Sequence, residues 1–319
     1  MEHQLSSMKS LSIVVPIFKD GALANDFCQS LDRITEEFLD AGVNRLEVIF
    51  VSDGVAEDIP HLQEACRRFS FAKYIAFTRN FGQHIAISCG LTHCSGDLAV
   101  YMDVDMEDPP SELPKLIREL EQSNSEICVG LRIGKKVSFI SRFTSRVFHT
   151  VLTRLTGLSM PANGTTMRVM TRNYLNAFVE LREKERYLPG IQAWLGHKTC
   201  YLPIAQQART RGETSYSFRK KLRLAIAAVL SFSDLPLRMV VRIGFGISAL
   251  SFVMASYLVI SRAFFMDYQP GYTSTTTLIM FFGGFQIFVT GLSGLYIGHI
   301  LREVQNRPLY VIREKFKIA

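Results

Sequence analysis

Two long apolar runs near the C-terminal end restrict the fold of this chain more than any other feature. Residues 243–261 and 278–298 contain no charged side chain. At a helical rise of 1.5 Å per residue, the first run reaches about 28 Å, close to the ~30 Å hydrocarbon core of a bilayer. A buried hairpin of a soluble protein is the alternative, but two adjacent uncharged runs of this length are typical of transmembrane helices. We expect a two-helix transmembrane domain over residues 239–301.

The charges around these runs predict their orientation. The connecting loop 263–277 contains no lysine or arginine. The flanks carry Arg238, Arg242, Arg302, Arg307, Arg313, Lys315 and Lys317. The positive-inside rule places both flanks in the cytoplasm, and Arg262, at the outer end of the first run, can snorkel to the interface. We expect a multi-pass protein of the inner (cytoplasmic) membrane, with both termini and the N-terminal domain in the cytoplasm.

The N-terminal two thirds alternates short apolar runs with amphipathic stretches. Strands are predicted at 11–17, 46–51, 73–78, 98–103, 126–131 and 200–205. Such alternation is typical of an α/β fold with a mostly parallel sheet and helices on both faces. Ligands of these sheets bind beyond the carboxyl ends of the strands. We expect this domain over residues 1–216.

Residues 217–238 connect the two domains and are basic first, then apolar. Their pattern predicts an amphipathic helix that lies on a membrane surface with its cations toward anionic lipid; a surface helix packed on the sheet is the alternative. Residues 302–319 are expected to form a cytoplasmic tail. The formal net charge of +7 suits phosphorylated or lipid partners. The six cysteines show no C-x-x-C pair or zinc spacing and indicate a reducing compartment.

The strongest local motif follows the strand predicted at 98–103. In an extended chain, residues i, i+2 and i+4 point the same way, so Asp103, Asp105 and Glu107 are expected to converge. Three carboxylates repel one another unless a cation lies between them, and oxygen ligands suit Mg²⁺ or Mn²⁺. Such a metal can bridge the phosphates of a nucleotide. An acidic surface turn before Pro109 is the alternative.

Polar residues also close the other predicted strands. Asp20 follows Pro16, and Asp53 follows the second strand, so both are placed to bind a nucleobase or ribose; helix capping and turn formation are the alternatives. Arg79 lies in a segment that ends the third strand and opens a helix, which suits an anion. His84, in the same segment, is more typical of a packed or capping histidine than of a catalyst.

Taken together, SIVVPIFKDG, VIFVSDGVAED, RNFGQH, MDVDMEDPP and RGETSYSFRKKLRL resemble the family 2 glycosyltransferases of GT-A fold. The chain is most similar to the polyprenyl-phosphate group, which contains dolichyl-phosphate mannose synthase, the bactoprenol glucosyltransferases and the undecaprenyl-phosphate aminoarabinose transferase. The resemblance extends over nearly the whole chain, including GLSGLYIGHILREVQNRPLYVIRE. It implies a GT-A, Rossmann-like catalytic domain that is held on the membrane.

The resemblance also implies roles for individual residues. The acidic trio would bind the metal, and Pro16, Asp20, Asp53 and Arg79 would line the nucleotide-sugar site. Acceptor-phosphate ligands are implied at Arg132, Ser145 and Arg146. Arg209 would close over the donor diphosphate and act in catalysis together with Asp103 and Asp105; guanidinium groups bind phosphate bidentately. For the arginines, solvated charge on helix faces is the alternative.

Three positions depart from the family pattern. Ser52 stands where a second aspartate is common, and Ser215 where a lysine is common. Thr166 replaces a common acid, so a carboxylate general base is in doubt. A phosphate monoester has a second pKa of about 6, so such a nucleophile needs little deprotonation.

The implied reaction is inverting transfer of a sugar from a nucleotide-sugar, with UDP the favoured carrier, to polyprenyl phosphate, for use in cell-envelope glycans. A processive polysaccharide synthase would need a Q-x-x-R-W motif and more spans. An inactive scaffold or flipping partner is a second alternative, which the acidic trio disfavours. Neither a nucleic-acid partner nor a P-loop is indicated, and a homo-oligomer is plausible. The sugar is not predicted.

Overall fold

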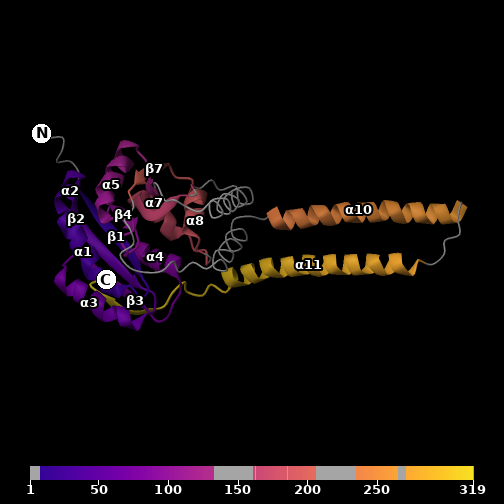
Figure 1. Cartoon of the computed structure of the whole chain (residues 1–319), viewed down its shortest axis with the longest axis horizontal. Helices are drawn as coiled ribbons and strands as arrows, with labels where there is room; N and C mark the ends of the chain where they lie inside the picture. The colour runs from indigo at the N-terminus through magenta and orange to yellow at the C-terminus, as the bar shows by residue number, and fades with distance from the viewer. Residues whose placement is uncertain are drawn as a thin grey trace. The chain divides into compact units, whose positions relative to one another are not determined.

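The computed structural model describes residues 8–132, 161, 163–184, 186–205, 235–264 and 271–318. The described residues form two units. The first contains the described residues up to 205 together with residues 308–318, and it is built around a sheet. The described part of the second consists mainly of two long helices, α10 (Leu235–Phe264) and α11 (Tyr272–Val304) (Figure 1).

The centre of the sheet is parallel. Its strands lie in the order β3 (Ala72–Phe77), β2 (Val43–Ser52), β1 (Lys9–Ile17) and β4 (Leu98–Tyr101). Consecutive residues of β1, which point to opposite faces of the sheet, are buried, as expected for a parallel strand covered by helices on each side. The chain adds β2 and β3 on one side of β1 and β4 on the other. This reversal is the topological switch point at which α/β sheets bind ligands.

The outer strands depart from the expected parallel pattern. β6 (Gly164–Thr171) runs antiparallel to β4 and to β5 (Ile127–Arg132), and β7 (Thr199–Ile204) pairs parallel with β5. The prediction of a mostly parallel sheet is therefore right for the centre and wrong for β6, which the strand prediction had missed. A direct β4–helix–β5 crossover leaves a gap between the two strands, and β6 fills it from the opposite direction.

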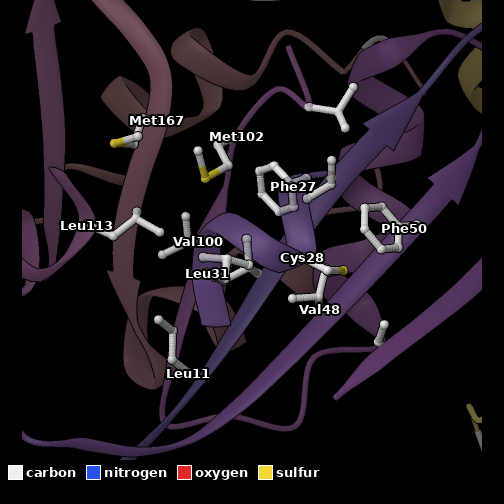
Figure 2. Close-up of a cluster of buried hydrophobic side chains, with 14 of the residues drawn as sticks. Leu11, Phe27, Cys28, Leu31, Val48, Phe50, Val100, Met102, Leu113 and Met167 are labelled. Atoms are coloured by element: carbon white, nitrogen blue, oxygen red, sulfur yellow. The ribbon is translucent and has the colours of Figure 1, made fainter. Parts of the chain in front are cut away.

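Helices cover both faces of the sheet. On one face α1 (Ala24–Arg33), α3 (Ile59–Arg68) and α5 (Leu113–Gln122) bury their apolar sides in a single core. Figure 2 shows Phe27 and Leu31 of α1 in that core. The short α2 (Thr35–Asp40) continues after α1 and packs on β2.

The other face carries α4 (Gln83–Thr92) and α7 (Arg172–Glu180), with α8 (Leu188–Leu195) packed on α7. The approach of α4 to β1 is close, because a Cβ on Gly90 would lie 2.2 Å from a methyl carbon of Val14. A glycine at this position allows α4 to lie directly on the central strand. The N-terminal end of α4 is thereby held at the carboxyl edge of the sheet.

The prediction that residues 302–319 form a C-terminal tail is wrong, because they include the end of a helix and a strand of the sheet. Residues up to Val304 belong to α11, and Ile312–Phe316 form β8, which pairs antiparallel with the edge strand β3. The ring of Phe316 stacks on Tyr74 with centroids 5.7 Å apart, and the Tyr74 hydroxyl donates to Glu314 Oε1 at 2.9 Å. After α11 the chain therefore returns to the sheet of the first unit.

One stretch of the described helices is long and apolar enough to cross a membrane. It is Phe282–Val304 of α11, and none of it is buried within the chain. The expected span 278–298 lies within α11, and the expected span 243–261 lies within α10. Among the described residues, the fold thus supports one spanning helix directly. The amphipathic helix expected over 217–238 lies almost wholly outside the described residues.

Glu47 of β2 forms hydrogen bonds with β1, with β3 and with the loop before β4, and it gives a first testable prediction. Its carboxylate, 7 % exposed, accepts from Ser12 Oγ at 2.5 Å, from Lys73 Nζ at 2.6 Å and from the backbone N–H of Ser95 at 3.1 Å. Burial raises the pKa of Glu47, but these hydrogen bonds outweigh it and the pKa lies below its ordinary value of 4.5. Folding is thus stabilised above pH 4.5, and the contribution is lost as the pH falls.

We expect Glu47→Gln to lower the free energy of unfolding at pH 7 by about 1–3 kcal/mol, because one acceptor oxygen becomes an NH₂ donor and the charge that faces Lys73 is lost. The difference from the wild type should shrink as the pH falls below 4.5, because the unfolded state then binds a proton at Glu47 before the folded state does. Thermal unfolding by circular dichroism at pH 7 and pH 4 measures both effects. Glu121→Gln, which removes the exposed pair with Lys9, is the control and should change stability by less than about 1 kcal/mol. Equal effects of the two substitutions would contradict the prediction.

Candidate active site

Four loops meet at the carboxyl edge of the central strands, because parallel strands end on the same side of the sheet. They follow β1, β2, β3 and β4 and include residues 18–23, 53–58, 78–82 and 102–109. Pro16 lies near the end of β1, and Asp20 is exposed in the loop that follows. Arg79 is exposed as well, with its guanidinium 4.1 Å from the ring centroid of Phe81. The predicted nucleotide ligands thus come from loops at one edge of the sheet.

Asp103 is the most closely surrounded of the predicted ligands. Its Oδ1 accepts from Gln83 Nε2 at 2.7 Å, and its Oδ2 accepts from Thr166 Oγ1 at 2.9 Å. Burial raises the pKa of Asp103 to about 6; the nearby Asp105 adds to this rise, and Arg132 opposes it. Gln83 comes from the first turn of α4 and Thr166 from β6, so two separate elements fix the orientation of this carboxylate.

The expected convergence of Asp103, Asp105 and Glu107 is not found. In the described part of the chain, no group of three His, Cys, Asp or Glu side chains could hold a metal ion. The physical reason is that β4 ends at Tyr101, so the acidic residues lie in a turn rather than in an extended strand. In that turn Met106 has a φ of 56°, and Asp105 Oδ1 accepts the backbone N–H of Glu107 at 3.1 Å.

A smaller donor set remains that fits a divalent cation. Besides burial, the negative charges of Asp105 and Asp108 raise the pKa of Asp103, so these carboxyl groups lie near one another. Hard carboxylate oxygens suit Mg²⁺ or Mn²⁺, and such ions in enzymes usually take further oxygens from substrate phosphates. Two carboxylates are therefore sufficient for a metal that is shared with a phosphorylated ligand.

Asp53 has a role in the fold that the sequence did not reveal. It is 3 % exposed, and its two oxygens accept the backbone N–H groups of Phe81 at 2.6 Å and Gly82 at 2.9 Å. Burial raises the pKa of Asp53, although these two hydrogen bonds and the charge of Arg79 act in the opposite direction. The carboxylate thus holds the loop that leads into α4, and its contact with a nucleotide stays a prediction.

The basic residues are only partly described. Arg132 ends β5 half-buried, its backbone N–H donates to Asn163 O at 3.0 Å, and its buried Nε has no hydrogen-bond partner among the described residues. Its charge lowers the pKa of Asp103, so the two side chains lie in the same site. Three other predicted ligands, Ser145, Arg146 and Arg209, lie outside the described residues.

Sequence reasoning missed several groups around this site. Gln83 was not selected, although its position in the first turn after the third strand was a usable signal. Arg168 is buried on β6, donates to Gln192 Oε1, and has its guanidinium carbon 5.7 Å from the Tyr101 ring centroid. Burial, together with the charge of Arg168, lowers the pKa of His84 to about 4, so His84 is a neutral, packed imidazole at neutral pH. No local sequence pattern indicates the tertiary contacts of Arg168.

Comparison with known proteins places this geometry in a family. Residues 12–178 match the model of glycosyl transferase family 2. The chain is 29 % identical over 306 residues to an uncharacterized glycosyltransferase of Synechocystis, covering 95 % of each chain. It is also 29 % identical over 309 residues to the SfII prophage-derived bactoprenol glucosyl transferase of Shigella flexneri, covering 96 % of this chain and 98 % of the relative.

A solved structure shows the same fold. Glucosyl-3-phosphoglycerate synthase from Mycobacterium tuberculosis, in complex with phosphoglyceric acid, superimposes with a TM-score of 0.51 at 18 % identity. The match covers 70 % of this chain and 80 % of the synthase. The family match includes the loops after β1 to β4 and the site around Asp103. The chain therefore belongs to glycosyl transferase family 2 and is a glycosyltransferase.

Proposed function

We propose that this protein transfers a sugar from a UDP-linked donor to a polyprenyl phosphate at the cytoplasmic face of the inner membrane, with inversion at the anomeric carbon. The observation that carries the proposal is the likeness to a bactoprenol glucosyl transferase, because it extends over 96 % of this chain and 98 % of the relative. It thus includes the apolar helices as well as the sheet. The product would supply a lipid-linked sugar for modification of envelope glycans.

The site supports a displacement at one centre. A phosphate oxygen of the acceptor attacks the anomeric carbon, a new C–O bond forms, and the bond to the diphosphate breaks with its electron pair on the departing UDP. Asp103 and Asp105 would hold Mg²⁺ or Mn²⁺ against the donor diphosphate, which would offset the charge that develops on the leaving group. The fixed orientation of Asp103 by Gln83 and Thr166 supports this assignment.

Thr166 and Arg132 fit a phosphate nucleophile. Thr166 donates its hydroxyl to Asp103 and so provides no carboxylate base. A phosphate monoester is largely dianionic at neutral pH and does not need one. The positive charge of Arg132, which acts on Asp103, would also attract an acceptor phosphate. We propose that Ser145 and Arg146 also bind this phosphate, and that Arg209 binds the donor diphosphate.

The fold gives an argument for two membrane crossings. Residues 199–204 form β7 and residues 312–316 form β8 of the same sheet, so the chain before α10 and the chain after α11 lie on one side of any membrane. The number of crossings between residues 205 and 308 must then be even. Because α11 contains an exposed apolar stretch of spanning length, a second crossing is needed, and we propose that α10 supplies it.

Cysteine labelling tests this topology. The native cysteines are all buried, so an introduced surface cysteine is labelled selectively. We expect a membrane-impermeant maleimide to label Thr275→Cys, in the first turn of α11, in intact spheroplasts. Glu57→Cys and Gln305→Cys, which are also exposed positions, should react only after lysis. Labelling of residues 57 and 275 from the same side would contradict the two-helix span.

A transfer assay tests the function. Purified full-length protein in detergent is incubated with Mg²⁺ or Mn²⁺, undecaprenyl phosphate and a panel of radiolabelled UDP-sugars. We expect one sugar to enter the lipid extract, and no label to enter it when undecaprenol replaces the phosphate. Absence of lipid-linked product with every sugar would overturn the proposed donor or acceptor. Product formed equally well with undecaprenol would overturn the phosphate nucleophile.

A further inference from the structure

We propose that two buried carboxylates on a single loop, Asp53 and Asp58, fix the shapes of the two loops that flank it, and that they act as positioning residues for the donor site. The inference rests on the proposed function, because the flanking loops carry Asp20 and Arg79. Neither carboxylate is needed as a ligand in this arrangement. Each holds backbone N–H groups of a neighbouring loop instead.

Asp58 holds the loop between β1 and α1. It is 3 % exposed, and its Oδ2 and Oδ1 accept the backbone N–H groups of Lys19 at 3.0 Å and Gly21 at 2.9 Å. These donors stand on either side of Asp20 in the sequence. Lys19 has a φ of 67°, a left-handed conformation that a non-glycine residue adopts only when its surroundings impose it. The hydrogen bonds of Asp58 provide that constraint.

Asp53 holds the loop between β3 and α4 in the same manner. Its carboxylate bridges the backbone N–H groups of Phe81 and Gly82, two and three residues after Arg79. Loop 53–58 contacts loop 78–82 at Gly54, which has a φ of 79°. A Cβ added to Gly54 would lie 2.1 Å from the carbonyl carbon of Arg79. A side chain at position 54 would therefore push the Arg79 backbone away.

The consequence is a mechanical link between the parts of the donor site. Residues 53–58 form the loop between β2 and α3, ending in a single 3-10 turn (Ala56–Asp58). Charged acceptors make shorter and stronger hydrogen bonds to backbone N–H than neutral ones do. One short loop thus sets the backbone beside Asp20 at one end and beside Arg79 at the other. Both ends must be in place for the two side chains to meet one ligand.

Hydrogen–deuterium exchange of the full-length protein in detergent tests the hydrogen bonds of Asp53 and those of Asp58 separately. Asparagine keeps the size of aspartate but replaces one acceptor oxygen with an NH₂ group. We expect Asp58→Asn to increase exchange about tenfold in peptides covering residues 18–23 and to leave residues 78–84 unchanged; Asp53→Asn should do the reverse. Faster exchange of both loops in either variant, or of neither loop, would overturn the proposal.

Kinetics then distinguish positioning from a general loss of stability. Both variants should raise the KM for the UDP-sugar about tenfold while the KM for undecaprenyl phosphate and kcat change by less than about twofold. The matched control is Asp97→Asn, which removes a carboxylate that accepts Ser10 N at 2.9 Å at the opposite edge of the sheet. Glu57→Gln is a second, exposed control. Neither control should alter the donor KM.

An unchanged donor KM in both aspartate variants, or an equal rise in Asp97→Asn, would overturn the positioning role. The exchange measurement requires no sugar transfer. Absence of transfer by the wild type would therefore refute the proposed function while the exchange pattern still decides whether Asp53 and Asp58 hold their loops.

Discussion

Replacing Asp105 by alanine is expected to reduce kcat/KM for sugar transfer by about a thousandfold, the loss that follows removal of a group that stabilises developing charge in a transition state. Asp105 lies near the oriented carboxylate of Asp103, and its negative charge adds to the rise in the pKa of Asp103 that burial causes. Without the second carboxylate, a divalent cation would have one protein ligand in place of two. Its contribution to departure of the nucleoside diphosphate would be lost with it.

The fold should survive this change. The hydrogen bond from the Glu107 N–H to Asp105 lies within one turn and contributes about 1 kcal/mol. Unfolding is measured by reaction of the buried cysteines, which all belong to the sheet unit, with a fluorogenic maleimide during heating. Asp40→Ala, at an exposed position of α2, is the control for removal of an acidic side chain. The metal role would be wrong if Asp105→Ala kept wild-type transfer rates with the same dependence on Mg²⁺ or Mn²⁺.

The centre of the fold could be predicted because local patterns determine it. Parallel strands buried on both faces require continuous apolar runs, and residues 11–17 and 46–51 meet that requirement within a few residues. The helical character of 243–261 and 278–298 was predicted equally well, since uncharged runs of that length have few other ways to satisfy their backbone. Such features depend on neighbours in the sequence, so the sequence alone is sufficient.

The geometry of the site depended on contacts that no local pattern contains. The trio of acidic residues was expected on an extended strand, but β4 ends two residues earlier and the chain turns. Asp53 occurs in a motif typical of ligand binding, yet both of its oxygens accept backbone N–H groups from a loop 28 and 29 residues away. Gln83 precedes Asp103 by 20 residues and Thr166 follows it by 63, yet both donate hydrogen bonds to its carboxylate. These side chains are brought together only by the assembled sheet.

The C-terminal strand was missed for a different reason. Residues 312–316, IREKF, place three consecutive charged side chains between two apolar ones, which is equally typical of a solvated tail. Their partner, β3, lies about 240 residues earlier, as the contact between Tyr74 and Glu314 shows. Charged side chains on such a strand protect the sheet edge from pairing with other molecules. The charged residues after the membrane span can therefore mark the cytoplasmic side of the membrane and also form an edge strand. Only the first of these roles was predicted from the sequence.

Ending the chain after Arg307 is expected to destabilise the sheet unit by about 5 kcal/mol, through loss of the β8 ladder and of two aromatic stacks. One stack joins Phe316 to Tyr74, and the other joins Tyr310 to Phe77 with centroids 5.1 Å apart. The loss compares with a total stability of about 5–15 kcal/mol for a typical domain. Sugar transfer should fall in parallel, although both long helices are still present.

The size of this effect decides whether the end of the chain is a tail or part of the catalytic domain. A tail can be removed with little change, whereas a strand that covers β3 cannot, because its removal exposes unpaired backbone groups along the new edge. The maleimide-monitored unfolding midpoint should fall sharply after truncation at Arg307 and only slightly after removal of residues 317–319, which costs the hydrogen bond from Lys317 Nζ to Cys66 O at 2.6 Å. Tyr310→Ala should lie between these limits, and Tyr310→Phe, which keeps the ring stacked on Phe77, close to the wild type. Equal midpoints for the two truncations would show that β8 does not hold the sheet. The placement of residues 205 and 308 on the same side of the membrane would then lose its basis.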